Sequence, residues 1–228
     1  MNLFDYVLDP ANWSGSGGIT ELLIQHLYYT ALSVVAAAVI AIPLGVLIGH
    51  TRRGSFLVIG TSNAARAIPS LGLLVLVVLL LGTGIWPIIL VLAILALPSI
   101  LTATTAGVEG ADPDAVYSAR ALGMTGMQIV TQVEWPLALP LVISGLRSAT
   151  LQVVATATVA AFAAGGGLGA LLIAGQRTSN YSQMFAGAVL VAALAIVLDV
   201  LLGGIGRLVS RRSRPKRKII AGTVPVRT

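Results

Sequence analysis

Long runs of apolar residues, separated by short polar stretches, form the main pattern of this chain. A helix that crosses a membrane needs about 20 predominantly apolar residues in succession. Runs of at least that length cover residues 22–49, 55–81, 86–106, 136–164 and 184–208. A glycine-rich connector at 165–169 leads into a shorter apolar piece at 168–174. Because backbone groups inside lipid must satisfy their own hydrogen bonds, the pattern predicts an all-α integral membrane protein with about five transmembrane helices.

The composition argues against a soluble domain. Apolar residues make up 57% of the 228 residues and charged residues 10%, whereas soluble domains carry roughly 25% charged residues. A soluble fold of this length has no interior large enough to hide so much apolar surface. The chain has no cysteine, which excludes disulfides and thiolate metal sites.

The residues that usually carry chemistry are sparse. Neither of the lysines, Lys216 and Lys218, follows a glycine, so this chain cannot build a phosphate-binding loop of the Walker type. His26 and His50 lie at opposite ends of the first run with no acid–base group beside them in sequence, and we interpret both as interfacial residues. We therefore expect no catalytic residue, no metal site and no cofactor in this chain.

The basic residues indicate an orientation. Of the 14 Lys and Arg residues, Arg66 and Arg147 lie within runs and Arg177 lies alone on one side, while all the others fall on the opposite side. Cytoplasmic segments carry the excess of Lys and Arg, so we expect an external N-terminus and a cytoplasmic C-terminus. The chain then divides into an extracellular segment (1–19), a membrane domain (20–208) with a cytoplasmic loop (108–135), and a basic cytoplasmic tail (209–228). We expect this tail to contact anionic lipid rather than nucleic acid.

Local signals predict a helix at the start of the 108–135 loop. Asp112 is suited to an N-cap and Pro113 to the first helical position. Apolar residues then recur on one face as far as Leu122. Gly123 is placed to end the helix at the residue after its C-cap.

A second helix is predicted to follow at once. Thr125, with Gln128 three residues later, forms a capping box for it. We expect this helix to stop or bend at Pro136. The loop is thus a compact helix–turn–helix, and on these features alone it is either a plain connector between two spans or a docking element for a partner.

A spaced set of residues crosses this loop: Ala119, Gly123, Val133 and Pro136. The stretch resembles the cytoplasmic signature of binding-protein-dependent permeases of ATP-binding cassette (ABC) transporters. That signature reads Glu-Ala-Ala, three residues, Gly, nine residues and Ile-x-Leu-Pro. Tyr117 replaces its acidic residue here, which removes any salt bridge made from that position in relatives. A serine and a tryptophan replace an alanine and a leucine, and the spacing is kept.

Further segments narrow the resemblance. Residues 66–71 read Arg-Ala-Ile-Pro-Ser-Leu, Gly123 begins Gly-Met-Thr, Pro136 begins Pro-Leu-Ala-Leu-Pro and Gly145 begins Gly-Leu-Arg. Together with the glycines at 165–169, these segments resemble osmoprotectant permeases for glycine betaine, carnitine and choline. Methionine-type importers share several of them, so methionine or another amino-acid-like solute is the alternative. Some osmoprotectant permeases carry a fused binding domain; we expect the binding protein here to be separate.

The resemblance implies a fold, a location and partners. The fold is that of type I ABC importer permeases, in a bacterial plasma membrane. The expected partners are two ABC ATPases that bind ATP and Mg, a second identical or similar permease chain, and an extracellular substrate-binding protein. The residues expected to couple this chain to the ATPase are Tyr117, Ser118, Ala119, Arg120, Leu122, Gly123, Val133 and Pro136.

Two arginines lie deep in predicted spans, where charge is costly and usually faces protein or water. Arg66 and Arg147 either tie carbonyls freed near prolines or line or gate the transport pathway. We take both, together with Pro69, as candidate pathway or gate residues, and Asp199 in the last run as a candidate ion partner. A secondary transporter or channel subunit, and a membrane scaffold, remain as alternatives of a different class. Secondary transporters often show inverted repeats, and no second copy of either half is evident here.

Overall fold

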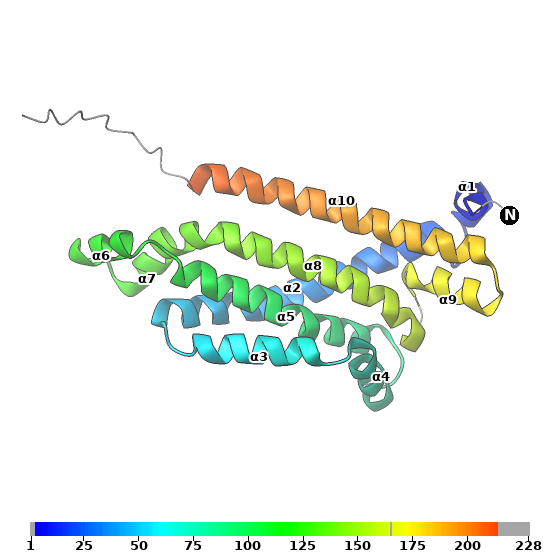
Figure 1. Ribbon diagram of the computed structural model, residues 1–228, viewed down its shortest axis with the longest axis horizontal. Coiled ribbons are helices and arrows are strands. Elements are labelled where there is room, and N and C mark those ends of the chain that lie inside the picture. The colour runs from blue at the N-terminus through cyan, green and yellow to red at the C-terminus, as the bar shows by residue number, and fades with distance from the viewer. Residues whose placement is uncertain (1–2, 165, 214–228) are drawn as a thin grey trace, which may run out of the picture.

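The computed structural model describes residues 3–164 and 166–213, and the described residues form helices and turns (Figure 1). In chain order the elements are α1 (Asp5–Leu8), η1 (Pro10–Asn12), α2 (Ile19–Thr51), α3 (Ser55–Ala67), α4 (Ser70–Leu81), α5 (Ile85–Glu109), α6 (Pro113–Ala121), α7 (Gly126–Ile129), the π-helical turn η2 (Val130–Glu134), α8 (Trp135–Ala164), α9 (Gly169–Arg177) and α10 (Tyr181–Ser213). Within this part of the chain, four helical segments are long and apolar enough to cross a membrane: α2, α5, the continuous segment Gly126–Ala163, and α10. The all-α membrane fold predicted from the sequence is confirmed.

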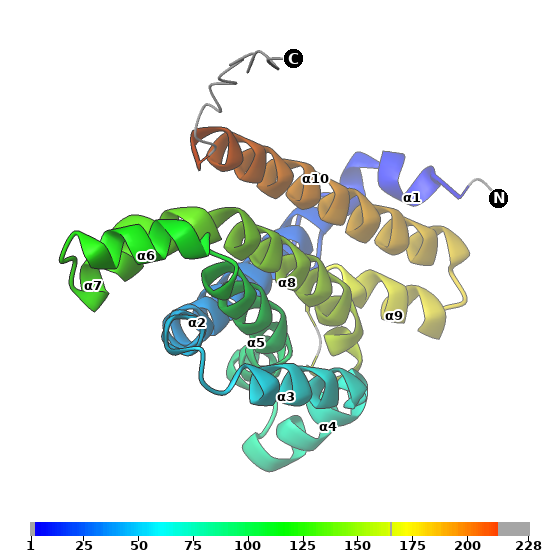
Figure 2. The same ribbon diagram turned by 60° about the vertical axis from the view of Figure 1, so that its left-hand side comes forward.

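The second apolar run is not a single spanning helix, which corrects the prediction for residues 55–81. The run is divided into α3 and α4, with Pro69 at the N-cap of α4. The proline ring disfavours helical backbone at Ile68, so the helix ends there. Figures 1 and 2 show α4 turned away from α3. With 12 residues, α4 is about 18 Å long, too short to cross the ~30 Å hydrocarbon layer by itself.

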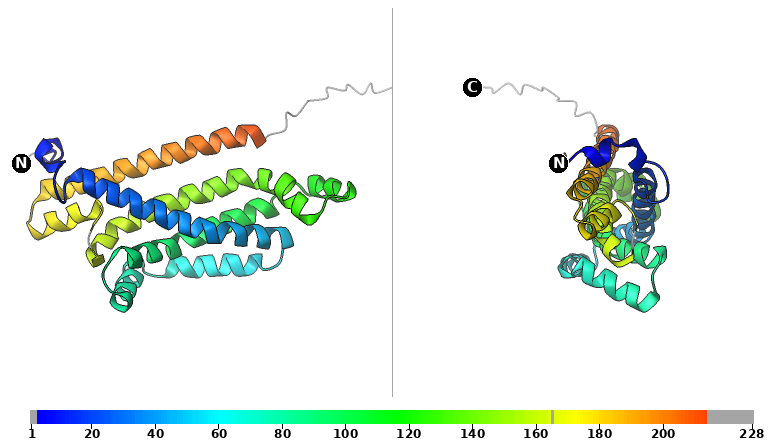
Figure 3. Two further views of the ribbon diagram at one scale, coloured as in Figure 1. Left: turned by 180° about the vertical axis from the view of Figure 1, so that it is seen from behind. Right: turned by 90° about the vertical axis from the view of Figure 1, so that its right-hand side faces the viewer.

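Small residues let α2 and α5 approach closely. Ala37, Ala41, Gly45 and Gly49 recur at every fourth position of α2, and all are buried. A Cβ atom added to Gly45 would lie 2.7 Å from the Cβ of Thr104 on α5. Without a hydrophobic drive between helices in lipid, such close backbone contact is a main source of helix association. Figure 3 shows α2 crossing the back of the bundle against α5 and α8.

The glycine-rich connector is fastened to α2 by hydrogen bonds. The backbone N–H of Leu168 donates to His26 Nδ1 at 3.3 Å, and that of Gly167 donates to Gln25 Oε1 at 3.1 Å. His26 Nε2 lies 3.1 Å from the carbonyl oxygen of Val154 on α8. His26 is fully buried, so the interpretation of it as an interfacial residue is wrong: the connector folds over the imidazole and donates to Nδ1, while Nε2 contacts α8.

The N-terminal segment lies against the start of α10. The backbone N–H of Tyr6 donates to Ser182 Oγ at 3.1 Å, and the rings of Phe4 and Phe185 meet edge to face with centroids 5.1 Å apart. α1, α9 and the start of α10 therefore form one end of the molecule, and α6 and α7 form the other (Figure 1). The tail at 214–228 lies outside the described residues.

Candidate functional site

Helix α6 is held at both ends by the predicted caps. The Asp112 carboxylate accepts the backbone N–H of Asp114 at 3.0 Å, with Pro113 as the first helical residue. At the other end Gly123 has φ +80°, and its N–H donates to the carbonyl of Arg120 at 2.9 Å. The following N–H, of Met124, reaches back to the carbonyl of Ala119 at 3.1 Å. These two bonds form a Schellman motif, which needs a left-handed residue at the position of Gly123.

The capping box that opens α7 is also present. The N–H of Thr125 donates to Gln128 Oε1 at 2.8 Å, and the N–H of Gln128 donates back to Thr125 Oγ1 at 3.4 Å. The two short helices of the loop are therefore rigidly defined by local bonds, as predicted. A capped turn of this kind can transmit a displacement instead of absorbing it.

The second helix does not stop at Pro136, which corrects that prediction. Helical structure continues from α7 through the π-helical turn into α8. The N–H of Trp135 donates to the carbonyl of Val130, five residues back. Proline has no N–H and its ring crowds the carbonyl four residues earlier. The wider π turn just before Pro136 accommodates both effects without ending the helix, and it joins α7 to the membrane-spanning α8.

Three large apolar side chains are exposed on this end of the molecule. The exposed fractions of Tyr117, Leu122 and Met127 are 76%, 83% and 73%. We call these three residues the coupling tip. They come from α6, its C-cap and α7, at the end of the molecule farthest from α9 (Figure 1).

The other predicted coupling residues divide into two groups. Ser118, Arg120 and Gly123 are exposed beside the tip, whereas Ala119 is buried and Val133 and Pro136 are half-buried. The second group therefore positions the tip and does not form its surface. Met127 was not singled out from the sequence; the available signal was an apolar residue between Thr125 and Gln128, the two residues of the capping box.

A bidentate ion pair joins α8 to α10 inside the membrane-spanning region. Arg147 Nε and Nη2 lie 2.5 Å from Asp199 Oδ1 and Oδ2 respectively. The guanidinium also lies against the backbone of α10 at Gly203, where an added Cβ atom would be in ordinary van der Waals contact with Arg147 Cζ at 3.5 Å. Asp199, the candidate ion partner identified in the sequence, is thus paired with Arg147.

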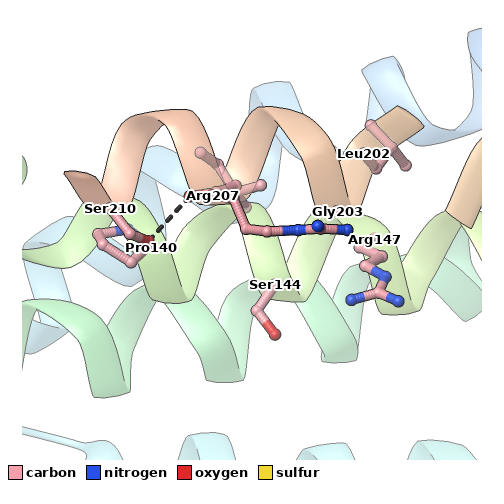
Figure 4. A pocket seen from close by; sticks show the side chains of 9 residues that line it. Pro140, Ser144, Arg147, Leu202, Gly203, Arg207 and Ser210 are labelled. Atoms are coloured by element: carbon pink, nitrogen blue, oxygen red, sulfur yellow. Dashed lines mark hydrogen bonds between the residues drawn. The ribbon is translucent and has the colours of Figure 1, made fainter. Parts of the chain in front are cut away.

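Arg147 also lines a cleft of about 400 Å³ between α8 and α10. Ser144 and Arg147 face Gly203 and Arg207 across it (Figure 4). The exposed fractions of the Arg147 and Asp199 side chains are 44% and 29% in this single chain. A charged pair at this depth needs protein or water beside it, because lipid does not solvate charge.

The remaining candidate pathway residues lie elsewhere. Pro69 is exposed between α3 and α4, and α3 and α4 lie on the opposite side of the bundle from α10 (Figures 1 and 2). Arg66 belongs to α3, and its side chain is outside the described part of the chain. Within one chain, then, Pro69 and Arg147 are not brought to a common site.

Comparison with known proteins agrees with this arrangement. Residues 41–215 match the family model of the binding-protein-dependent transport system inner membrane component. The chain is 36% identical to the glycine betaine/carnitine/choline transport system permease protein OpuCB of Bacillus subtilis, over 78% of this chain and 82% of that relative. It is 34% identical to the osmoprotectant import permease protein OsmW of Salmonella typhimurium, over 89% and 94% of the two chains.

A solved structure shares the fold. A chain of the inward-facing MetNI methionine ABC transporter superposes with a TM-score of 0.74 at 27% identity, over 88% of this chain and 98% of that one. The family model covers most of the chain, including the capped loop, the π turn and the Arg147–Asp199 pair. The chain therefore belongs to the binding-protein-dependent transport system inner membrane components, and it is the non-catalytic permease subunit of an ABC importer.

Proposed function

We propose that this permease imports a compatible solute with a quaternary ammonium group, such as glycine betaine, carnitine or choline. The observation that carries the proposal is the 31–36% identity to permeases named for these solutes over most of the chain. The methionine alternative has the support of a structural neighbour at 27% identity. A separate extracellular binding protein delivers the solute and holds it in an aromatic cage, the usual site for quaternary ammonium.

The coupling tip is the contact with the ATPase in this proposal. Three large apolar side chains on one exposed, capped element form the kind of surface that marks a protein interface. A short rigid helix such as α6 fits a groove on its partner. Two ATPases bind ATP and Mg, and their closure displaces the two capped helices. The unbroken path from α7 through the π turn carries this displacement into α8.

The ion-paired face of α8 and α10 faces a second permease chain or the water-filled pathway between the two chains. Support comes from the exposed Arg147–Asp199 pair, which lipid would not solvate. Because the pair also fixes α8 to α10, a movement of α8 also moves α10. Arg147 is then a gate-positioning residue, not a binding residue, because a cation would repel a quaternary ammonium solute. The orientation predicted from the basic residues places the coupling tip in the cytoplasm and α9 outside.

Copurification tests the contact at the coupling tip. Leu122→Glu places a charge on a side chain that is 83% exposed, so the permease itself should insert and fold normally. In the complex the charge would be buried in an apolar contact without a partner, which is unfavourable by ~1–3 kcal/mol or more. We expect a loss of ATPase copurification of roughly tenfold or greater.

The matched control is Leu8→Glu. Leu8 is 74% exposed on α1, at the opposite end of the molecule, and carries the same substitution. This variant should bind the ATPase like the unmodified permease. Equal recovery of ATPase with both variants would show that the coupling tip is not the contact.

A further inference from the structure

A histidine and a glutamate meet where α2 ends and the π turn begins to lead into α8. His50 Nδ1 lies 2.7 Å from Glu134 Oε2. Glu134 is buried with an exposed fraction of 5%, whereas the side chain of His50 is 25% exposed. A buried carboxylate is costly unless it is paired and hydrogen-bonded, so this contact stabilises the only charged residue of the π turn.

The backbone of His50 is held in a fixed position. The residue before it, Gly49, packs so closely on α5 that a Cβ atom there would lie 2.7 Å from Val108 Cβ and 2.9 Å from the carbonyl oxygen of Thr105. His50 therefore belongs to the rigid α2–α5 unit. It is a fixed point from which the neighbouring coupling segment can be braced.

Glu134, by contrast, belongs to the segment that carries the coupling tip. It is the last residue of the π turn, between α7 and α8. A π-helical turn interrupts the regular i to i−4 bonding and is frequent at functional sites. The His50–Glu134 contact thus bridges the rigid unit and the coupling segment at the one irregular turn between α7 and α8.

The surroundings of the pair are charged and open to water. Arg52 on the α2 C-cap, Asp114, Tyr117 and Arg120 on α6, and Glu134 line the same cleft as His50. On α5, Glu109 receives the hydroxyl of Ser55, and its carbonyl oxygen accepts from Arg52 Nη2 at 3.4 Å.

The second ring nitrogen of His50 faces the other end of the coupling segment. A Cβ atom added to Gly126 on α7 would lie 3.5 Å from Nε2. The imidazole therefore lies between Gly126 at the start of α7 and Glu134 at the end of the π turn.

We propose that the His50–Glu134 pair is a positioning element that braces the coupling tip against α2. A hydrogen bond to a buried carboxylate fixes its position, because a buried carboxylate without a partner is costly. The pair therefore holds the π turn against the rigid α2–α5 unit, so that a displacement of α6 and α7 moves α8 with them. Without the pair, the irregular turn absorbs part of this displacement and coupled transport falls.

This inference rests on the proposed function, since it needs the tip to contact an ATPase on the cytoplasmic side. The experiment uses the complete transporter, with permease, ATPases and binding protein, in proteoliposomes. The measured quantity is solute imported per ATP hydrolysed. We expect this ratio to fall roughly fivefold, relative to the unmodified permease, when Glu134 loses its partner.

Three variants separate a brace from a general structural role. His50→Arg keeps a donor beside Glu134, so the ratio should stay high. His50→Leu removes the donor and should give a low ratio. The exchange of the two residues, His50→Glu with Glu134→His, should restore the ratio.

The outcomes distinguish the inference from the function on which it rests. If ATP-driven uptake is absent with the unmodified permease, the proposed function has failed. If uptake is present but His50→Leu imports as much solute per ATP as the unmodified permease, the brace is refuted. The brace is also refuted if the exchange variant assembles with the ATPases but stays uncoupled.

Discussion

The contact between α2 and α5 can be tested at Gly45 with a single methyl group. A Cβ atom at this position would lie 2.7 Å from Thr104 Cβ, 2.9 Å from Thr104 Cγ2 and 3.2 Å from the carbonyl oxygen of Leu101. Carbon atoms pack at about 3.5–4.0 Å. No rotamer change moves the Cβ of Thr104, so the two helices must separate by about 1 Å to admit the methyl group.

The expected cost follows from that separation. Adding a methyl group to a well-packed contact is unfavourable by typically ~1–3 kcal/mol, and alanine recovers ~1 kcal/mol over glycine through helix propensity. Gly45→Ala should therefore destabilise the permease by as much as ~2 kcal/mol, which lowers the apparent unfolding temperature by up to roughly 8 °C for a chain of this size. The assay is thermal unfolding of the purified permease in detergent, followed by tryptophan fluorescence.

The matched control is Gly204→Ala in α10. No atom lies within 4 Å of a Cβ atom added there, so the same methyl group gains helix propensity without a clash. This variant should unfold at the same temperature as the unmodified permease or slightly higher. An unfolding temperature for Gly45→Ala equal to or above that of Gly204→Ala would refute the close packing of α2 on α5.

Three further predictions follow from other contacts. Asp199→Asn should lower the yield and the unfolding temperature of the permease, because it leaves Arg147 without a carboxylate. Asp199→Leu combined with Arg147→Met should recover both. A double variant as unstable as the single variant would show that the ion pair does not stabilise the fold. Gly167 has φ +63°, and a Cβ atom added there would lie 3.0 Å from Nδ1 of the buried His26. Gly167→Ala should therefore speed hydrogen exchange in the connector, and unchanged exchange would contradict the hydrogen bonds that join the connector to α2. In intact cells an impermeant thiol reagent should label Ser179→Cys and spare Asp114→Cys; the reverse would overturn the orientation.

Local features of the fold were predictable from the sequence. Each of the caps at Asp112, Gly123 and Thr125 is formed between residues no more than five positions apart, and the structure confirms all three. The limits of the long apolar runs also lie within about five residues of α2, α5, α8 and α10, whereas the run at 55–81 is divided into α3 and α4. Here short-range chemistry and membrane thickness are sufficient to decide the outcome.

The effect of each proline was not predictable in the same way. Pro43 and Pro98 lie inside continuous helices, whereas Pro69 separates two helices and Pro136 follows a π turn. A proline always frees a carbonyl, but neighbouring helices decide whether that carbonyl is satisfied in place. That information is absent from the sequence around the proline.

Contacts between distant residues were also beyond the sequence. His50 and Glu134 are 84 positions apart, and neither has a local signal for the other. His26 looked interfacial because it begins a run, yet a connector more than 130 residues later covers it. Arg147 and Asp199 were suggested as a pair only because charge is rare in the spans; their bidentate geometry came from the packing of α8 on α10.

ATP-driven uptake of radiolabelled glycine betaine is the most direct test of the central claim. The permease is reconstituted in proteoliposomes with its ATPases and a substrate-binding protein, and uptake is compared with and without each component. The account predicts uptake that needs all three proteins and hydrolysable ATP, and that competes with carnitine or choline but not with methionine. Uptake by the permease alone, driven by an ion gradient without ATP, would contradict it.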